Sequence, residues 1–199
     1  IGVRLVGSEM CIRDRGTAYT KLSLRDSAQM YFKTAEKAIQ GIQDYDLETG
    51  LWMNQGILYV HLSEYEKARA EFEKVLESAL EVKNNEDISR CYNNIAVCNG
   101  YLGDYEGALK MHMKSSEMAK DLEDPISLAK SYNNMGLIYF DLDDYEKSEE
   151  YLLKSLEIKK EQGAEVSVVG SYLNLGNVFR KLGVNNKDSI TLNKAKKYY

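Results

Sequence analysis

Apolar and small residues recur along the chain at two periods, one helical and one much longer. In one stretch Tyr92, Ile95 and Leu102 are spaced i, i+3 and i+10, which places them on one face of a helix. The same kinds of residue recur every 40 positions, in the columns Trp52/Tyr92/Tyr132/Tyr172, Gly56/Ala96/Gly136/Gly176 and Leu62/Leu102/Leu142/Leu182. A repeat of this length predicts stacked structural units rather than one continuous globular core.

Each repeat predicts two helices, because a second helical stripe, such as Ala68 and Phe72, follows the first after a short break. Asp104 and Asp144 stand where they would cap second helices, and Pro125 stands where a new helix would begin. The small residue within each first helix is expected to let the two helices approach closely. After a first segment ending near residue 22, helices are predicted over 25–42, 46–62, 65–82, 86–102, 105–121, 126–142, 145–161 and 165–182. A β-strand within 45–182 would contradict this interpretation.

A family resemblance rests on two motifs and their helical partners. The motifs are Trp52-x2-Gln55-Gly56-x2-Tyr59 with Ala68-x3-Phe72, and Tyr132-x2-Met135-Gly136-x2-Tyr139. They resemble the tetratricopeptide repeat pattern W-x2-L-G-x2-Y…A-x3-F. Departures are Gln55 for leucine, Asn99 for tyrosine, His112 for the aromatic residue and the missing final proline. The resemblance implies an all-α, right-handed tetratricopeptide superhelical solenoid of stacked antiparallel helix hairpins.

The spacing of the columns is similar to that of a longer-helix branch of the family. This branch includes kinesin light chains, LGN-type scaffolds, and bacterial peptide-receptor and sensor-kinase repeats. The register implies a truncated first repeat at 16–44, repeats at 45–84, 85–124 and 125–164, and a truncated last repeat at 165–199.

Both ends of the chain depart from the register. Residues 1–15 resemble translated sequencing-adapter sequence (VGSEMCIRDR), so we expect a non-native origin; the alternative is a divergent capping helix. After Gly183 an insertion would place Leu192, Ala195 and Tyr199 in the columns of the second helix. Without it, Asp188 would point into the helix pair, so we favour the insertion. Because no polar capping repeat follows, we expect the chain to be part of a longer protein.

Composition excludes several classes of protein. The chain has 26 Lys and Arg against 31 Asp and Glu, a net charge of −5, which argues against a dedicated nucleic-acid surface. No apolar run approaches the ~18 to 20 residues of a transmembrane helix. Cys91 and Cys98 lie seven positions apart on one predicted helix, about 10.5 Å between Cα atoms, too far for a disulfide. Reduced thiols and a cytoplasmic location are therefore expected.

Motifs for catalysis are absent from the sequence, which has no P-loop, GxSxG, HExxH or kinase signature. His61 and His112 stand far apart in the sequence, without companions at ligand spacing. Acidic residues alternate with lysines, as in EYEKARAEFEK, which is typical of solvated helix faces. We expect no enzymatic activity, no cofactor and no metal site.

Asparagine occupies one column of four predicted first helices, although its amide competes with helical backbone hydrogen bonds. At about 100° per residue, the stripe of Arg90, Asn94, Val97 and Tyr101 lies about 150° from the core stripe. The family resemblance implies that this open side is the concave groove. We predict a peptide-binding groove of Asn54, Asn94, Asn134, Asn174, Asn93, Asn133, Arg90, Lys130, Val97, Leu137, Tyr101 and Phe140. The alternative, compatible with the first, is that neighbouring asparagines hydrogen-bond each other across stacked helices.

In this groove the amides would bind peptide main chain, Arg90 and Lys130 an acidic side chain, and the apolar residues an apolar one. The leading hypothesis is a non-catalytic protein–protein interaction module that binds a peptide segment of a partner. The alternative is a sensory or relay region of a larger bacterial signalling protein, such as a histidine kinase or transcriptional regulator. A third is a structural spacer without a ligand. We expect a protein or peptide partner, neither nucleic acid nor membrane, and self-association through uncapped ends.

Overall fold

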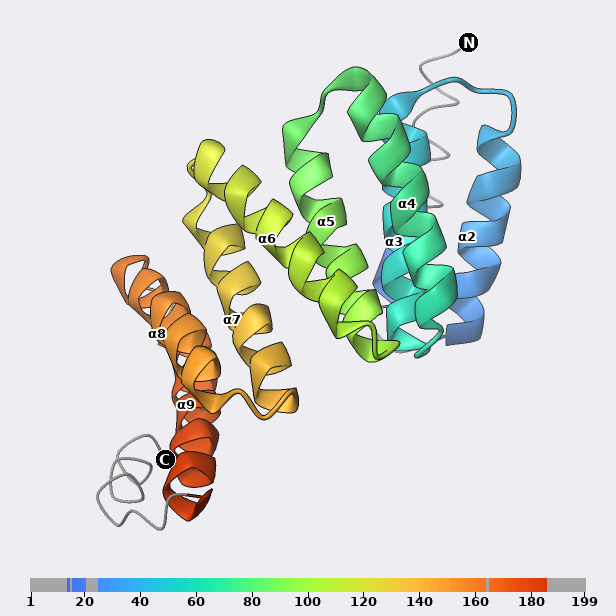
Figure 1. Ribbon diagram of the computed structural model, residues 1–199. Helices are drawn as coiled ribbons and strands as arrows, with labels where there is room; N and C mark the ends of the chain where they lie inside the picture. Colours follow the sequence, from blue (N-terminus) through green and yellow to red (C-terminus); the bar gives the residue numbers. More distant parts are fainter. Residues whose placement is uncertain (1–13, 15, 21–24, 164, 186–199) are drawn as a thin grey trace. The chain divides into compact units, whose positions relative to one another are not determined.

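The computed structural model describes residues 14, 16–20, 25–163 and 165–185, and helices joined by tight turns make up this part of the chain (Figure 1). The named helices are α2 (Arg25–Ile39), α3 (Tyr45–His61), α4 (Tyr65–Val82), α5 (Asn85–Tyr101), α6 (Tyr105–Asp121), α7 (Pro125–Asp141), α8 (Tyr145–Glu161) and α9 (Glu165–Asn185). The described residues contain no strand, so the all-α prediction is confirmed. Every predicted helix from residue 25 onward is present, with bounds that differ by three positions or fewer.

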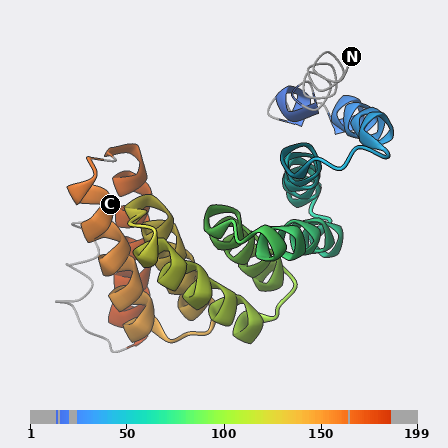
Figure 2. The same cartoon turned by 90° about the horizontal axis from the view of Figure 1, so that it is seen from above.

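The chain divides into two compact units, an N-terminal unit up to Gly103 and a C-terminal unit from Asp104 onward. In the N-terminal unit α3 packs against α2 and α4, and α4 packs against α5. In the C-terminal unit α7 packs against α6 and α8, and α8 packs against α9 (Figures 1 and 2). The boundary falls inside the repeat predicted over 85–124; the repeat boundaries themselves stay a prediction.

Aspartate caps begin several of these helices, as the sequence predicts. The side chains of Asp104 and Asp144 each accept a hydrogen bond from the backbone N–H three positions later, at 2.9 and 3.1 Å. Pro125 opens α7 directly after a third cap, Asp124, which accepts from two backbone N–H groups. These side chains satisfy donors that the first helical turn leaves unpaired.

Two helix ends differ from the prediction by three positions, more than any of the others. Helix α2 ends at Ile39 rather than near residue 42, because Gly41 adopts a left-handed φ of 86°. Helix α9 continues to Asn185, three positions past residue 182 where the prediction ends it. The residues that distinguish the two registers of the C-terminus, and residues 1–13 and 15 of the adapter-like segment, lie outside the described residues.

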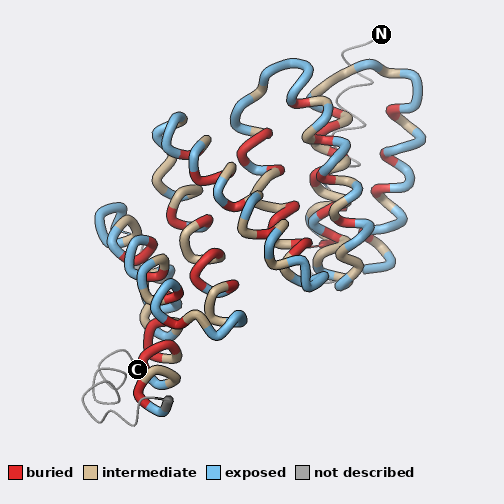
Figure 3. The backbone as a smooth tube through the Cα atoms, viewed as in Figure 1, coloured by how far each residue is buried: buried red, intermediate tan, exposed pale blue. Residues whose placement is uncertain are grey.

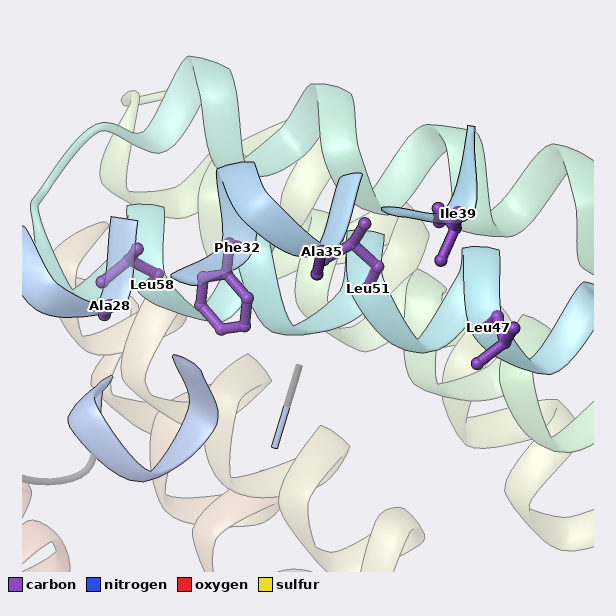
Figure 4. Packing of buried hydrophobic residues seen from close by; sticks show 7 residues of the cluster. All are labelled: Ala28, Phe32, Ala35, Ile39, Leu47, Leu51 and Leu58. Atoms are coloured by element: carbon purple, nitrogen blue, oxygen red, sulfur yellow. The ribbon is translucent and has the colours of Figure 1, made fainter. Parts of the chain in front are cut away.

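Each unit has a hydrophobic cluster between consecutive helices. In the N-terminal unit, side chains of α2 and α3 point toward one another (Figure 4). This cluster consists of Ala28, Phe32, Ala35, Ile39, Leu47, Leu51 and Leu58. Its counterpart in the C-terminal unit consists of Tyr145, Leu152, Leu156, Leu175, Val178 and Phe179. Buried positions recur along every described helix, as the helical period requires (Figure 3).

Candidate functional site

The predicted groove residues of the N-terminal unit lie on α3 and α5, and none of them belongs to the hydrophobic cluster of α2 and α3. Asn54, Asn94 and Val97 are half-buried, and Arg90 and Tyr101 are exposed. A cleft of about 290 Å³ opens between the N-terminal halves of α3 and α5. This α3–α5 cleft is lined by Asp46, Thr49, Gly50, Met53, Asn54, Asp87 and Arg90. Two predicted residues, Asn54 and Arg90, therefore meet in one cleft.

Asp87 is the residue around which this cleft is organised. Its Oδ2 accepts hydrogen bonds from the Tyr45 hydroxyl at 2.7 Å and from Asn84 Nδ2 at 3.1 Å. Its Oδ1 lies 3.1 Å from Nη1 of Arg90. Burial and the neighbouring Asp87 carboxylate raise the pKa of Tyr45 above its ordinary value, so the phenol stays a hydrogen-bond donor. The bond between Tyr45 and Asp87 joins α3 to α5, and Asp87 lines the cleft.

Sequence reasoning missed both Tyr45 and Asp87. In the register of the repeats, Tyr45 aligns with Asn85 and Pro125, so no column marks it. Asp87 aligns with Leu47 and Ser127, and the carboxylate therefore occurs once among these three repeats. A signal based on repetition detects only side chains that recur.

The asparagine amides of this unit are differently engaged. Asn94 Nδ2 lies 3.4 Å from Sδ of Met53, a weak acceptor. Among the residues that the structure describes, none hydrogen-bonds to the side chain of Asn54. Oδ1 of Asn93 is buried and has no partner in the same part of the chain. The amide of Asn54 is thus available to a ligand that enters the cleft.

The N-terminal halves of α3 and α5 carry polar side chains at the cleft, whereas their C-terminal halves carry exposed apolar ones. Ile57 is 38% exposed, and Tyr101 is 64% exposed although its ring stacks on that of Tyr65. The two ring centroids are 4.4 Å apart and the planes differ by 7°. Val97 lies one helical turn before Tyr101 on α5. Exposed apolar side chains on the same helices as free amides suit a ligand with both main-chain and apolar groups.

In the C-terminal unit, Asn133 forms the centre of a hydrogen-bond network. Its Oδ1 accepts from Nδ2 of Asn174 at 3.4 Å and from Nζ of Lys159 at 3.5 Å. Its own Nδ2 donates to Oδ1 of Asn134 at 3.5 Å. The cross-helix asparagine contact that the sequence offers as an alternative is therefore present between α7 and α9.

Lys159 of α8 is a member of this network that the sequence did not indicate. Its Nζ also donates to Oγ of Ser171 at 2.8 Å, and burial lowers its pKa. The equivalent positions of the two preceding repeats are Ala119 and Ala79, both buried. Because the lysine occurs in only one of these three repeats, it forms no repeating column in the sequence.

Three other predicted residues of the C-terminal unit have distinct surroundings. Lys130 and Leu137 are exposed on α7, as a groove position requires. Phe140 instead packs against the hydrophobic cluster of this unit, with its ring edge-on to Tyr145 at a centroid distance of 5.5 Å. The structure therefore places Phe140 with the core residues rather than on the open face of α7.

The two described cysteines are not activated as nucleophiles or metal ligands. Cys91 and Cys98 are free and buried, and burial raises the pKa of the two thiols to about 12 and about 11. Within the described ranges, no group of three or more His, Cys, Asp or Glu side chains is placed to hold a metal ion. No helix described here is both long and apolar enough to span a bilayer.

Tetratricopeptide repeat family models match residues 46–121 and 129–162, together more than half of the chain. The chain is similar to BtubC (BKLC) from P. vanneervenii, with a TM-score of 0.80 and 22% identity, over 99% of this chain and 82% of that one. It is similar to a Rap protein complexed with Competence and Sporulation Factor, with a TM-score of 0.76 and 20% identity, over 94% and 52% of the two chains.

A third similar structure is a Signal Transduction ATPase with Numerous Domains (STAND) protein with a tetratricopeptide repeat sensor from Pyrococcus horikoshii. Its TM-score is 0.78 at 22% identity, over 96% of this chain and 29% of that one. A search of curated protein sequences finds no match. The family models and these likenesses confirm the predicted repeat fold.

Proposed function

Because the chain belongs to the tetratricopeptide repeat family, we propose that it is a non-catalytic module that binds a peptide segment of a partner protein. The observation that carries this proposal is the unpartnered amide of Asn54 in the α3–α5 cleft, within the part of the chain that the structure describes. A carboxamide donates to a peptide C=O and accepts from a peptide N–H, so it recognises main chain without demanding one side chain. The similar Rap protein was solved with Competence and Sporulation Factor bound, which supports the assignment.

The proposed binding surface of the N-terminal unit has a polar and an apolar part. Asn54 and Asn94 would hold the peptide backbone, while Ile57, Val97 and Tyr101 would take an apolar side chain. Apolar side chains exposed to water are unfavourable in free energy, and a ligand that covers them removes this penalty.

The proposal extends to Asn93 of the N-terminal unit and to Asn133, Asn134 and Asn174 of the C-terminal unit. The hydrogen bonds that join the last three are 3.4–3.5 Å long, at the weak end of the range. A peptide group that enters would exchange these long hydrogen bonds for its own. Lys130 and Leu137, exposed on the same face of α7, would contact peptide side chains.

A second candidate function is a sensory or relay region within a larger signalling protein. The similarity to a STAND protein with a tetratricopeptide repeat sensor favours it. This chain spans less than a third of that protein's length. Peptide binding and sensing are compatible, since a sensor also binds a ligand.

The buried thiols support a reducing compartment such as the cytoplasm, because Cys91 and Cys98 are free. Self-association stays a prediction; Val169 and Leu173 of α9 are 59% and 46% exposed and are the side chains through which it would occur.

The test is selection of peptides from a random displayed library against the whole chain, followed by affinity measurement by calorimetry. Asn54→Ala combined with Asn94→Ala should weaken binding of selected peptides by about 1–3 kcal/mol, since each hydrogen bond contributes about 0.5–1.5 kcal/mol. Helix content should not fall, because alanine is the better helix former. Gln55→Ala is the matched control, because this neighbouring amide lines a different cleft, between α2 and α3. Equal binding by the double variant and the control contradicts the proposal.

A further inference from the structure

We propose that the α3–α5 cleft selects a basic side chain, lysine or arginine, in the bound peptide. The peptide itself rests on the proposed function, whereas the preference for a cation rests on the lining of the cleft. Two carboxylates, Asp46 on α3 and Asp87 on α5, face one guanidinium, Arg90. The lining therefore carries a net negative charge.

The charge of Arg90 is already compensated within the protein. Its Nη1 lies 3.1 Å from Oδ1 of Asp87, whose side chain is only 17% exposed. Asp87 is in turn held by the hydroxyl of Tyr45 and the amide of Asn84, so it cannot move away without breaking both bonds. An acidic peptide side chain would have to compete with this carboxylate for Arg90. The structure thus disfavours the acidic specificity that the sequence suggested for Arg90.

Asp46 is the uncompensated charge of the cleft. Its carboxylate is exposed and makes no hydrogen bond or ion pair within the described part of the chain. A cation that enters the cleft pairs with Asp46 and is also attracted by the nearby carboxylate of Asp87. Arg90 meanwhile keeps Asp87 as its own partner. Charge complementarity of this kind sets the choice of partner more than the raw affinity.

The helix N-termini at the cleft do not reverse this preference. A bare N-terminus attracts anions through its unpaired N–H groups. Here Asp44 accepts from the N–H of Leu47 at 3.0 Å, and Asn84 accepts from the N–H of Asp87 at 3.2 Å. The first turns also carry Asp46 and Glu48 on α3, and Glu86 and Asp87 on α5. These carboxylates offset the positive ends of both helix dipoles.

The shape of the cleft suits a long cationic side chain. Gly50 contributes no side chain, and the hydroxyl of Thr49 is turned back to the carbonyl of Tyr45 at 2.6 Å. Met53 offers an apolar wall for the methylene groups of lysine or arginine, whose charged heads stay near water. Asn54, on the same wall, is placed to bind the peptide main chain at that residue.

The test uses two small probes, N-acetyl-arginine methylamide and N-acetyl-glutamate methylamide, titrated into the isotope-labelled whole chain and followed by amide NMR shifts. The arginine probe should shift the signals of Gly50 and Asn54, and the glutamate probe should not. Asp46→Asn should weaken the arginine probe about two- to fivefold, the range of one solvent-screened ion pair. Asp46→Lys should abolish its binding. Raised salt should weaken it as well.

Glu48→Gln is the matched control, since it removes a carboxylate from the same turn of α3 outside the cleft lining and should leave probe binding unchanged. Thermal melts should show equal stability for Glu48→Gln and Asp46→Asn, because both lose one first-turn carboxylate. Stronger binding of the glutamate probe, or equal binding of the arginine probe by Asp46→Asn, overturns the inference.

The failures of the two proposals are distinguishable. Selected peptides that depend on Asn54 and Asn94 but lack any enrichment in lysine or arginine keep the proposed function and overturn this inference. An arginine probe that binds at Asp46, in a chain from which no library peptide is ever selected, supports this inference and contradicts the proposed function.

Discussion

The ring of Phe72 lies so close to Gly56 that a β-carbon added at position 56 would lie 2.5 Å from Cε1 of the ring. The same relationship recurs between Gly136 and Leu152, where the nearest side-chain carbon would lie 2.7 Å away. Gly56 and Gly136 thus each admit a large side chain of the following helix. At Gly170 of α9, by contrast, no described heavy atom beyond the adjoining helix backbone lies within 4 Å of the added carbon.

Gly56→Ala should therefore lower the free energy of unfolding by about 1–3 kcal/mol, because the ring of Phe72 must move aside. Gly170→Ala should raise it by about 0.5–1 kcal/mol, since alanine favours a helix interior and meets nothing there. Urea denaturation of both variants measures the two effects. Changes of the same sign would show that helix propensity, not packing, decides both positions.

His112 should make stability depend on pH. It is 1% exposed, its Nδ1 has no hydrogen-bond partner in the described structure, and burial lowers its pKa to about 4 from 6.5. The unfolded chain therefore binds the proton more readily than the folded chain between these values. The contribution of neutral His112 is complete above pH 6.5 and is lost as the pH falls toward 4, by roughly 2–3 kcal/mol between pH 7.5 and 4.5.

His112→Leu should remove this dependence, since a leucine occupies the equivalent buried position 152. Denaturation of the parent and the variant at pH 7.5 and 4.5 gives the difference directly, and carboxylates that titrate in both proteins cancel. Parallel loss of stability in the two proteins would show that His112 is not the group that responds.

Asn133→Ala should cost about 1–2 kcal/mol of stability, because it leaves Asn174, Asn134 and Lys159 without the partner they share. Asn134→Ala loses one long hydrogen bond and gains helix propensity, so its effect should lie within about 0.5 kcal/mol. Chemical denaturation of the two variants measures the contrast. Equal effects would contradict a network centred on Asn133.

Asp104→Ala should lower stability by about 1 kcal/mol, the usual cost of losing an N-cap. Glu64 occupies the same column but makes no capping hydrogen bond, so Glu64→Ala should cost only its exposed ion pair with Lys67. Thermal unfolding followed by circular dichroism compares them. A larger loss in Glu64→Ala would show that charge rather than capping matters at this column.

The helices, their approximate ends and many of the residues that face the core are readable from the sequence, because local interactions determine them. The prediction was wrong for Leu102 and Leu142, which cap the ends of α5 and α7 and are 39% and 47% exposed. The helical period, the caps Asp104 and Asp144, and the small residue at position 56 each act within one hairpin. Each of these local patterns is weak in one repeat, but it becomes clear because it recurs in the next 40-residue repeat. Of the asparagines that the columns single out, Asn54 lines the α3–α5 cleft, and their role as a peptide-binding groove stays a proposal.

The chemistry of the site was decided only by the tertiary structure. Tyr45 and Asp87 have no counterpart in the neighbouring repeats, and neither does Lys159 beside Asn133; no column marks these residues. Their contacts depend on how far two helices lie apart and which rotamer fills the gap, and neither quantity repeats with the sequence. The same packing turned Phe140 toward Tyr145. The ion pair of Arg90 with Asp87 is instead a local contact, three positions apart on α5. Helix faces and the Arg90–Asp87 pair are thus local properties of this chain. The bond of Tyr45 to Asp87, and the meeting of Asp46 with Asp87 in one cleft, depend instead on how α3 packs beside α5.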